Sequence, residues 1–564
     1  MHFKNYITLF VLILFSSLIR SQDLQLQIIG FTPQETSIIS RYSYPISHTS
    51  LESIKKNVAL FQNKLLENGY LNHKLVAISK TTDSFYVAQI HLKNKIENIH
   101  IYIDSLLNTQ SYFSKLNLPE IKNNHIYLPY LNIESQLKNF NTTISASGYP
   151  FSTLKLVDIT QKNPSTLSAK LIIDTQDDIR RLDKIIIKGY EKFPKSYLKH
   201  YLKIKPNKIF NIESVNKKII NLNNLSFTRQ TKSPEILFTR DSTQLYLYLK
   251  KMSSNNFDGF IGFATNEVSN KIEFNGYLNL QLVNNLNYGE SLYLDYKSDE
   301  GEQKNFNLIA NLPYLFNSPL GLETSLNITK RDSTFITTKQ KASLFFQLNP
   351  KNTIYAGLQS TASSNLSNTD LITVVDYNSN FYTAKYQFLQ RQNEEKLFQI
   401  KSQLTAEFGI GKRKTSFGNE NQTLIDINAS HIFNLNKNNS IYIKGILQII
   451  NSENYLENEL YRFGGINSIR GFTENSLTAN NLYALNTEYR YKLSNTIFLN
   501  SIIDFADFKN KILEQKETLY SIGFGFGILT KGGLLRFIYA NGRKNNDSFN
   551  FSQSKIHLSL KSTF

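Results

Sequence analysis

The 564-residue chain contains no cysteine and no tryptophan, and it has only 2 methionines and 12 prolines. Without cysteine there can be no disulfide, no thiolate-bound metal and no lipid anchor on a cysteine. Aromatic residues still make up 13% of the chain, so phenylalanine and tyrosine must supply any aromatic belt. Beyond a short N-terminal stretch, the chain has no long apolar run that could form a membrane helix.

Enzymatic signatures are also missing. No Gly-x-Ser-x-Gly elbow occurs, and the segment at Gly411 lacks the pattern of a phosphate loop. Gly523, Gly525 and Gly527 alternate with apolar residues, which favours the small lumenal face of a strand over a dinucleotide loop. The histidines show no ligand spacing. We therefore expect no catalytic activity, no cofactor and no metal.

The first 21 residues follow the pattern of a signal peptide, with a charge at Lys4, an apolar run over 6–19 and a plausible cleavage point after Ser21. A run of 14 residues is shorter than the roughly 20 needed to span a bilayer. The alternative is that this segment is retained as a membrane anchor. A chain that is exported and contains no cysteine is predicted to lie in the periplasm and outer membrane of a Gram-negative cell.

The formal charge of +18 is compatible with nucleic acid or anionic lipid as a partner. However, the lysines are scattered along the chain rather than clustered. This distribution favours a solvated surface, and we expect no nucleic-acid partner.

An internal repeat occupies the first part of the mature chain. Helical periodicity stops at Gly69 and again at Gly148, 79 residues later, and a third unit stops about 79 residues further on without a glycine. The alternative is a single larger α+β domain, but the regular spacing favours three small βααββ modules. The expected domains are 1–21 (signal peptide), 22–95, 96–178 and 179–252 (modules), and 253–564 (barrel).

From Asn256 onward the apolar period changes from helical to two. One side of each strand is apolar and the other is polar, as expected for strands with lipid on one face and a wet lumen on the other. The sequence thus predicts a mainly β fold with a C-terminal transmembrane antiparallel β-barrel, although a soluble sandwich or propeller would alternate as well. About 310 residues suit sixteen strands, and fourteen or eighteen would also fit. The last strand ends with lipid-facing Ile556, Leu558, Leu560 and Phe564.

The most specific local motif is a glycine-rich loop between two strand-like stretches. It contains Gly464, Gly465, Arg470, Gly471 and Phe472. A loop so rich in glycine could fold inward instead of projecting into solvent.

Strand parity supplies candidate partners for Arg470. Glu488 and Asp504 should both face the lumen, where a guanidinium group can bind carboxylates in a bidentate manner. An exposed Arg470 with ordinary lumenal acids is an equally good interpretation of the residues alone.

These features together resemble the BamA/TamA superfamily of outer-membrane barrel assembly proteins over essentially the whole mature chain. The repeats resemble polypeptide-transport-associated (POTRA) domains, and three units are most like TamA. Residues 464–472 resemble the signature of the sixth extracellular loop, which tucks into the lumen, and the terminal Phe564 matches the insertion signal. The resemblance implies a sixteen-stranded barrel in which Arg470 contacts Glu488 and Asp504.

The resemblance also implies an insertase or translocation factor with a weak seam between the first strand, near 257–265, and the last, near 555–564. Gly523 and Gly525 would leave room for the tucked loop. The expected partners are outer-membrane lipid, unfolded outer-membrane or exported β-rich clients, and a TamB-like periplasmic protein. Two alternatives are a dedicated two-partner secretion pore, which needs a plug for which the chain has little room, and a passive porin or adhesin, which would not need three modules.

Overall fold

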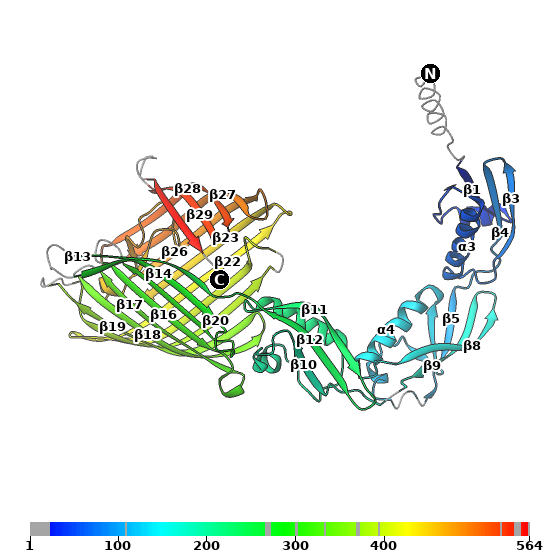
Figure 1. The fold of residues 1–564 in the computed structure, drawn as a ribbon, viewed down its shortest axis with the longest axis horizontal. Coiled ribbons are helices and arrows are strands. Elements are labelled where there is room, and N and C mark those ends of the chain that lie inside the picture. The colour runs from blue at the N-terminus through cyan, green and yellow to red at the C-terminus, as the bar shows by residue number, and fades with distance from the viewer. Residues whose placement is uncertain are drawn as a thin grey trace, which may run out of the picture. The chain divides into compact units, whose positions relative to one another are not determined.

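The computed structural model describes residues 23–105, 107, 110–176, 178–265, 272–298, 303–331, 334–367, 373–392, 395–530, 533–545 and 554–561. The expected signal peptide and Phe564 lie outside the described residues. The chain is mainly β and divides into two compact units (Figure 1). One unit comprises residues 1–181 with 209–212, and the other comprises 182–208 with 213–564.

The first module is a four-stranded sheet in the order β2-β1-β4-β3, in which β1 and β4 are parallel. Its elements are β1 (Leu24–Gly30), α2 (Pro33–Ile39), β2 (Ser47–His48), α3 (Leu51–Glu67), β3 (Lys74–Thr82) and β4 (Phe85–His91). Helix α3 buries Ile54, Val58, Phe61 and Leu65 in the module's core. Beyond its end, Gly69 has a φ of +93°, which glycine adopts without steric cost.

Glu35 ties helix α2 to the sheet of this module. Its carboxylate completes a capping box with Thr32 and lies 2.8 Å from His91 Nδ1. Burial acts to raise the pKa of Glu35, but the hydrogen bonds from His91 and from the Phe31 and Thr32 backbone outweigh it and leave the pKa below its ordinary value.

The second module is a five-stranded sheet in the order β6-β7-β5-β9-β8. Its elements are β5 (Asn98–Tyr102), η2 (Phe113–Lys115), β6 (Ile121–Lys122), β7 (His125–Pro129), η3 (Tyr130–Asn132), α4 (Ile133–Ala146), β8 (Thr153–Asn163) and β9 (Thr166–Asp174). Where the first module has α2, this one has a short 3₁₀ turn and a hairpin. Pro119 lies in that segment and keeps Leu118 out of the helical region. Gly148 follows α4 with a φ of +105°.

The third module is a three-stranded sheet in the order β10-β12-β11. Its elements are β10 (Lys184–Lys188), the π-helical turn η4 (Tyr197–Tyr201), α5 (Ile212–Ile219), η5 (Ile220–Asn224), β11 (Thr228–Phe238) and β12 (Thr243–Lys251). Its apolar core is continuous with the barrel, because Val283 and Tyr314 belong to the same cluster. The Tyr197 hydroxyl donates to the Gly289 carbonyl at 3.1 Å, and burial raises the pKa of Tyr197 well above its ordinary value.

The barrel is one antiparallel sheet of sixteen strands, as predicted. The first eight strands are β13 (Asn256–Thr265), β14 (Ile272–Val283), β15 (Ser291–Ser298), β16 (Lys304–Leu312), β17 (Leu320–Arg331), β18 (Phe335–Asn349), β19 (Asn352–Asn365) and β20 (Tyr377–Arg391). The other eight are β21 (Ile400–Thr415), β22 (Gly418–Asn434), β23 (Asn439–Asn451), β26 (Asn481–Lys492), β27 (Ile497–Asn510), β28 (Gln515–Thr530), β29 (Gly533–Lys544) and β30 (Lys555–Lys561). Four short elements lie between strands: η6 (Leu315–Asn317), η7 (Glu457–Glu459), β24 (Tyr461–Phe463) and β25 (Leu477–Ala479).

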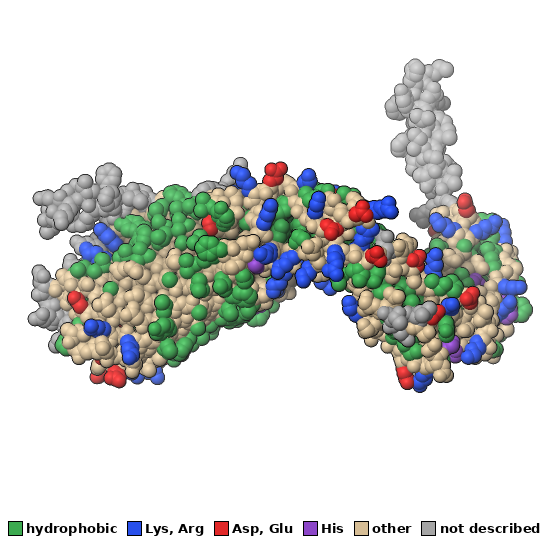
Figure 2. All heavy atoms as spheres, turned by 90° about the horizontal axis from the view of Figure 1, so that it is seen from below, with side chains coloured by type: hydrophobic (Ala, Val, Ile, Leu, Met, Phe, Trp, Pro, Cys, Tyr) green, Lys and Arg blue, Asp and Glu red, His purple; other side chains and the backbone are tan. Residues whose placement is uncertain are grey.

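The two faces of the barrel wall differ as the period of two predicts. Along β27, Leu499 and Ile503 are 45% and 59% exposed on the outside, whereas Asp504 is 1% exposed on the inside. The lumen carries paired charges such as Lys385 and Glu323, 2.5 Å apart. Figure 2 shows apolar side chains covering much of the outer wall.

Among the described residues, no helix is both long enough and apolar enough to cross a bilayer.

Candidate functional site: a loop locked inside the barrel

The segment between β23 and β26 forms a small hairpin, β24 and β25, whose tip carries the glycine-rich motif. Gly464, Gly465 and Gly471 all have positive φ, between +84° and +110°. The Gly464 N–H donates to Ser468 Oγ at 2.7 Å, and the Gly465 N–H donates to the Ile469 carbonyl at 3.0 Å. These bonds fold the tip back on itself, which side chains at the three glycine positions would oppose.

The structure brings Arg470 together with both carboxylates that strand parity selected. Arg470 Nε lies 2.7 Å from Asp504 Oδ2, and Nη2 lies 2.5 Å from Oδ1, so the pairing is bidentate. The Arg470 backbone N–H donates to the same carboxylate at 3.1 Å, and Nη1 donates to Glu488. Arg470 is only 4% exposed, so the loop lies inside the lumen.

The two carboxylates have different surroundings. Glu488 also accepts from Arg490 Nε at 2.7 Å and has Arg536 at 3.5 Å, while Arg490 lies between the rings of Tyr442 and Phe398. For Asp504, Arg470 is the only cationic partner within ion-pair distance in the described part of the chain. Three guanidinium groups therefore converge on two acids, and Asp504 depends on the loop alone.

The loop also packs against the penultimate strand, β29. A Cβ atom at Gly471 would meet the backbone of Asn541 and Gly542, and one at Gly542 would meet the Phe472 ring. Whether Gly523 and Gly525 leave room for the loop stays a prediction. The three atoms nearest to each missing Cβ belong to neighbouring strands, but the loop residue Ile466 packs against Ile502, Ile538 and Ala540, which pair with these two glycines on β27 and β29.

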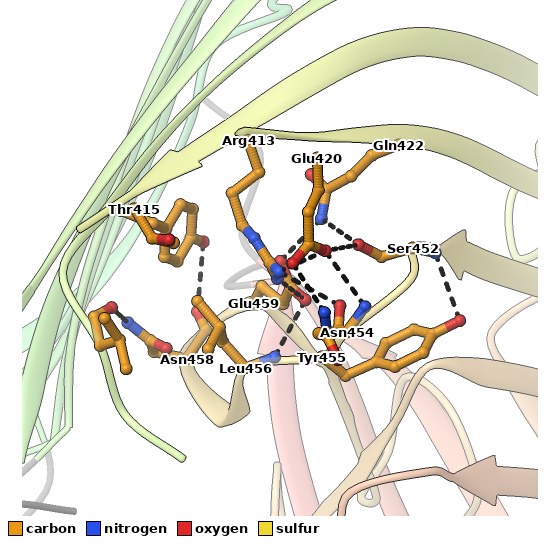
Figure 3. A network of polar contacts seen from close by, with 12 residues as sticks. Arg413, Thr415, Glu420, Gln422, Ser452, Asn454, Tyr455, Leu456, Asn458 and Glu459 are labelled. Carbon is orange, nitrogen blue, oxygen red and sulfur yellow. Dashed lines mark hydrogen bonds and ion pairs between the residues drawn. The ribbon is translucent and has the colours of Figure 1, made fainter. Parts of the chain in front are cut away.

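A second buried arginine anchors the same segment, and the sequence analysis did not identify it (Figure 3). Arg413 on β21 is 2% exposed. Its guanidinium group pairs with Glu420 of β22 at 2.8 Å and with Glu459 of η7, and it donates to the Asn454 carbonyl at 3.2 Å. Gln422 Nε2 donates to Glu459 Oε2 at 2.9 Å.

Further contacts hold η7 against other strands of the wall. Arg331 at the end of β17 pairs with Glu457 at 3.0 Å, and the Asn458 amide donates to Ser363 Oγ of β19 at 2.9 Å. The segment before the lumenal loop is thus fixed to β17, β19, β21 and β22. Arg413 has the inward parity of its strand, which could have indicated a buried partner. Nothing in the irregular segment around Glu459 marked that residue as the partner.

The two ends of the barrel sheet are not paired with each other in the described residues. Strand β13 pairs with β14 alone, and β30, with seven residues, pairs with β29 alone. On β30, Ile556, Leu558 and Leu560 are exposed on the outer face, as their parity predicts. The sheet therefore keeps one free edge on each side of a seam.

The described part of the chain contains no group of three or more His, Asp and Glu residues arranged to hold a metal ion. The charged clusters around Arg470 and Arg413 are ion pairs that fix the loop and the segment before it. Their geometry is that of a structural lock.

Comparison with solved structures identifies the fold. BamA from Haemophilus ducreyi lacking POTRA domains 1-3 matches with a TM-score of 0.50 and 16% identity, over 84% of this chain and 100% of that chain. CdiB from Acinetobacter baumannii matches with a TM-score of 0.54 and 15% identity, over 91% of this chain and 97% of that chain. CdiB from Escherichia coli matches with a TM-score of 0.51 and 14% identity, over 90% of this chain and 97% of that chain. No family profile matches the chain, and no curated protein sequence does so. The resemblance to the BamA/TamA superfamily is confirmed for the fold, and it extends to CdiB as well as to BamA.

Proposed function

We propose that this chain is an outer-membrane protein of the BamA/TamA superfamily that passes β-rich polypeptides into or across the membrane. The observation that carries the proposal is the seam, because β13 and β30 each keep an unpaired edge among the described residues. In a bilayer an unpaired backbone group costs several kcal/mol, so a free edge stays favourable only if another strand can pair with it.

An incoming β-segment can satisfy that edge by strand addition. Its N–H and C=O groups would bond to β13 or β30 while its apolar side chains face lipid. The process is therefore physical: the client forms hydrogen bonds with an unpaired edge of the seam, and no covalent bond changes.

In this proposal the three modules lie in the periplasm of a Gram-negative cell and meet clients before the barrel does. Their sheets offer edges of their own: β3 and β8 are outer strands with mostly exposed residues. Such edges suit an unfolded β-rich client or an elongated periplasmic partner of the TamB type.

A dedicated secretion pore is the second candidate. It is favoured by the two CdiB structures, whose similarity covers 90–91% of this chain. The two functions differ in what depends on the protein: many outer-membrane barrels in the first case and one secreted protein in the second.

The proposal can be tested by closing the seam with an engineered disulfide. Because the chain has no native cysteine, Gly259→Cys on β13 and Leu558→Cys on β30 place one thiol on each edge strand, and a disulfide that forms between them closes the seam. The control is Leu358→Cys with Tyr382→Cys, which face each other on the hydrogen-bonded strands β19 and β20. Each variant replaces the wild type in depleted cells under oxidising or reducing conditions.

Oxidation of the seam pair should lower the client proteins in the membrane or medium, and oxidation of the control pair should not. Proteomics then identifies which proteins fall. Loss of many barrels supports assembly, and loss of one exported protein supports the pore. Full function with the seam disulfide formed would contradict both.

A further inference from the structure

A basic cavity lies where the third module meets the barrel. It has a volume of about 260 Å³, and five of its lining residues are cationic or can become so: Lys199, His200, Lys203, Lys205 and Lys208. The four lysines are exposed, and none of them has a carboxylate within ion-pair distance in the described part of the chain. Four ammonium groups therefore share one site without a counter-charge.

The walls of this cavity are held in place by contacts between the module and the barrel turns. His200 Nε2 lies 2.8 Å from the Asn317 carbonyl, and its ring stacks on Tyr314. Lys203 Nζ donates to the Leu348 carbonyl at 3.1 Å. His200 and Lys203 thus fix the geometry, while Lys199, Lys205 and Lys208 are left to face a bound anion.

A further lysine adds to the positive charge behind the cavity. Lys218 Nζ donates to the Lys203 carbonyl at 2.9 Å. Burial is the main cause that lowers the pKa of Lys218, and the nearby Lys203 charge adds to it.

The cavity borders the apolar outer wall of the barrel. Phe346 lines it, and Leu320, which faces Phe346 across β17 and β18, is exposed like Leu348 nearby. Phe316 on the adjoining turn is fully exposed. Figure 2 shows Lys and Arg side chains gathered where the third module adjoins the apolar surface of the barrel. An anion bound here would have lipid-facing side chains directly beside it.

We propose that this cavity binds the phosphate of an anionic phospholipid of the periplasmic leaflet, with the acyl chains along Leu320 and Phe346. The lysines supply the charge that a phosphate requires, and the apolar wall supplies the surface that a soluble anion would not use. The inference rests on the proposed membrane orientation of the barrel. In this proposal the third module is attached at the membrane surface in two ways: by its contacts with the barrel turns and by the bound lipid.

Native mass spectrometry tests this site on the full-length protein released from nanodiscs of phosphatidylglycerol and phosphatidylcholine. The variant K199Q/K205Q/K208Q should retain phosphatidylglycerol at least about tenfold less than the wild type, because it lacks three of the four ammonium groups that attract an anionic lipid. The control K55Q/K56Q/K74Q removes three exposed charges of the first module and should behave as the wild type. The variant K199R/K205R/K208R should keep binding.

Wild-type retention of phosphatidylglycerol by the glutamine variant would overturn the site, as would equal retention of both lipids by the wild type. Displacement by an equal concentration of inorganic phosphate would overturn the choice of a lipid over a soluble anion. No client is present in this assay, so a negative result leaves the seam test unaffected, and a failed seam test does not change the lipid result.

Discussion

Removal of Arg470 should destabilise the barrel mainly through Asp504. In Arg470→Ala, Asp504 loses both side-chain bonds of the bidentate pair and stays buried with no cation within ion-pair distance among the described residues, whereas Glu488 keeps Arg490 at 2.7 Å and Arg536 at 3.5 Å. Removing one partner of a buried ion pair costs about 3–5 kcal/mol. We expect a loss of that size in the free energy of unfolding.

Double-mutant cycles separate the two carboxylates. The coupling between Arg470→Ala and Asp504→Asn should lie near the upper end of the roughly 0.5–3 kcal/mol seen for contacting residues, and that with Glu488→Gln near the lower end. Arg470→Lys should lie between the wild type and the alanine variant, because one ammonium group cannot reproduce the planar bidentate contact.

The assay is urea unfolding of the protein in lipid vesicles, followed by the shift between folded and unfolded bands on a gel. Wild-type stability of Arg470→Ala would refute the lock. A stronger coupling to Glu488 than to Asp504 would refute the assignment of Asp504 as the dependent group.

Three further predictions follow from the same contacts. Arg413→Ala leaves the buried Glu459 carboxylate and the partly exposed Glu420 carboxylate without their shared cation and should also cost about 3–5 kcal/mol in the urea assay, and an unchanged midpoint would contradict this. Gly542→Val should push Phe472 away and expose the loop to added protease, whereas Gly445→Val, which has open space at its Cβ, should not. The pKa of Glu35 in the folded chain is below its ordinary value, so its stabilisation is present above the ordinary carboxyl pKa and is lost as the pH falls through the lowered value. Hydrogen exchange of helix α2 should therefore be slower in the wild type than in Glu35→Gln at neutral pH and should converge in acid, and equal rates at neutral pH would contradict the prediction.

The sequence predicts best those features that depend on a local period. Successive residues of a strand face opposite sides, so the inward position of Glu488 and Asp504 follows from parity alone once the strands are recognised. The length available and the thickness of a membrane allow fourteen, sixteen or eighteen strands, and the resemblance to the superfamily favoured sixteen among them. Both kinds of inference need no knowledge of how distant segments meet.

Contacts made by irregular segments could not be predicted in this way, because such segments have no regular period. Glu459 lies on a single 3₁₀ turn, where no period assigns a direction, and its partner Arg413 is 46 residues away in the chain. The close approach of the loop to Gly542 depends on which strand passes beneath Gly471, and no local pattern of the sequence identifies that strand as β29. Strand parity predicts that a glycine faces the lumen, but it does not predict which segment packs against that glycine.

The two arginine networks and the unpaired seam belong to one physical problem. Among the described residues the first and last strands do not pair, so the hydrogen bonds that normally close a barrel wall are missing there and the remaining strands must keep their shape by other means. Arg413 fixes the segment before the loop to β21 and β22, Arg470 fixes its tip to β26 and β27, and Gly471 lies against β29. One lumenal segment thus braces the wall from β21 to β29. Strand β30, by contrast, is held to the wall by seven residues paired with β29, so opening of the seam can be confined to the strands at its two edges while the braced wall stays intact.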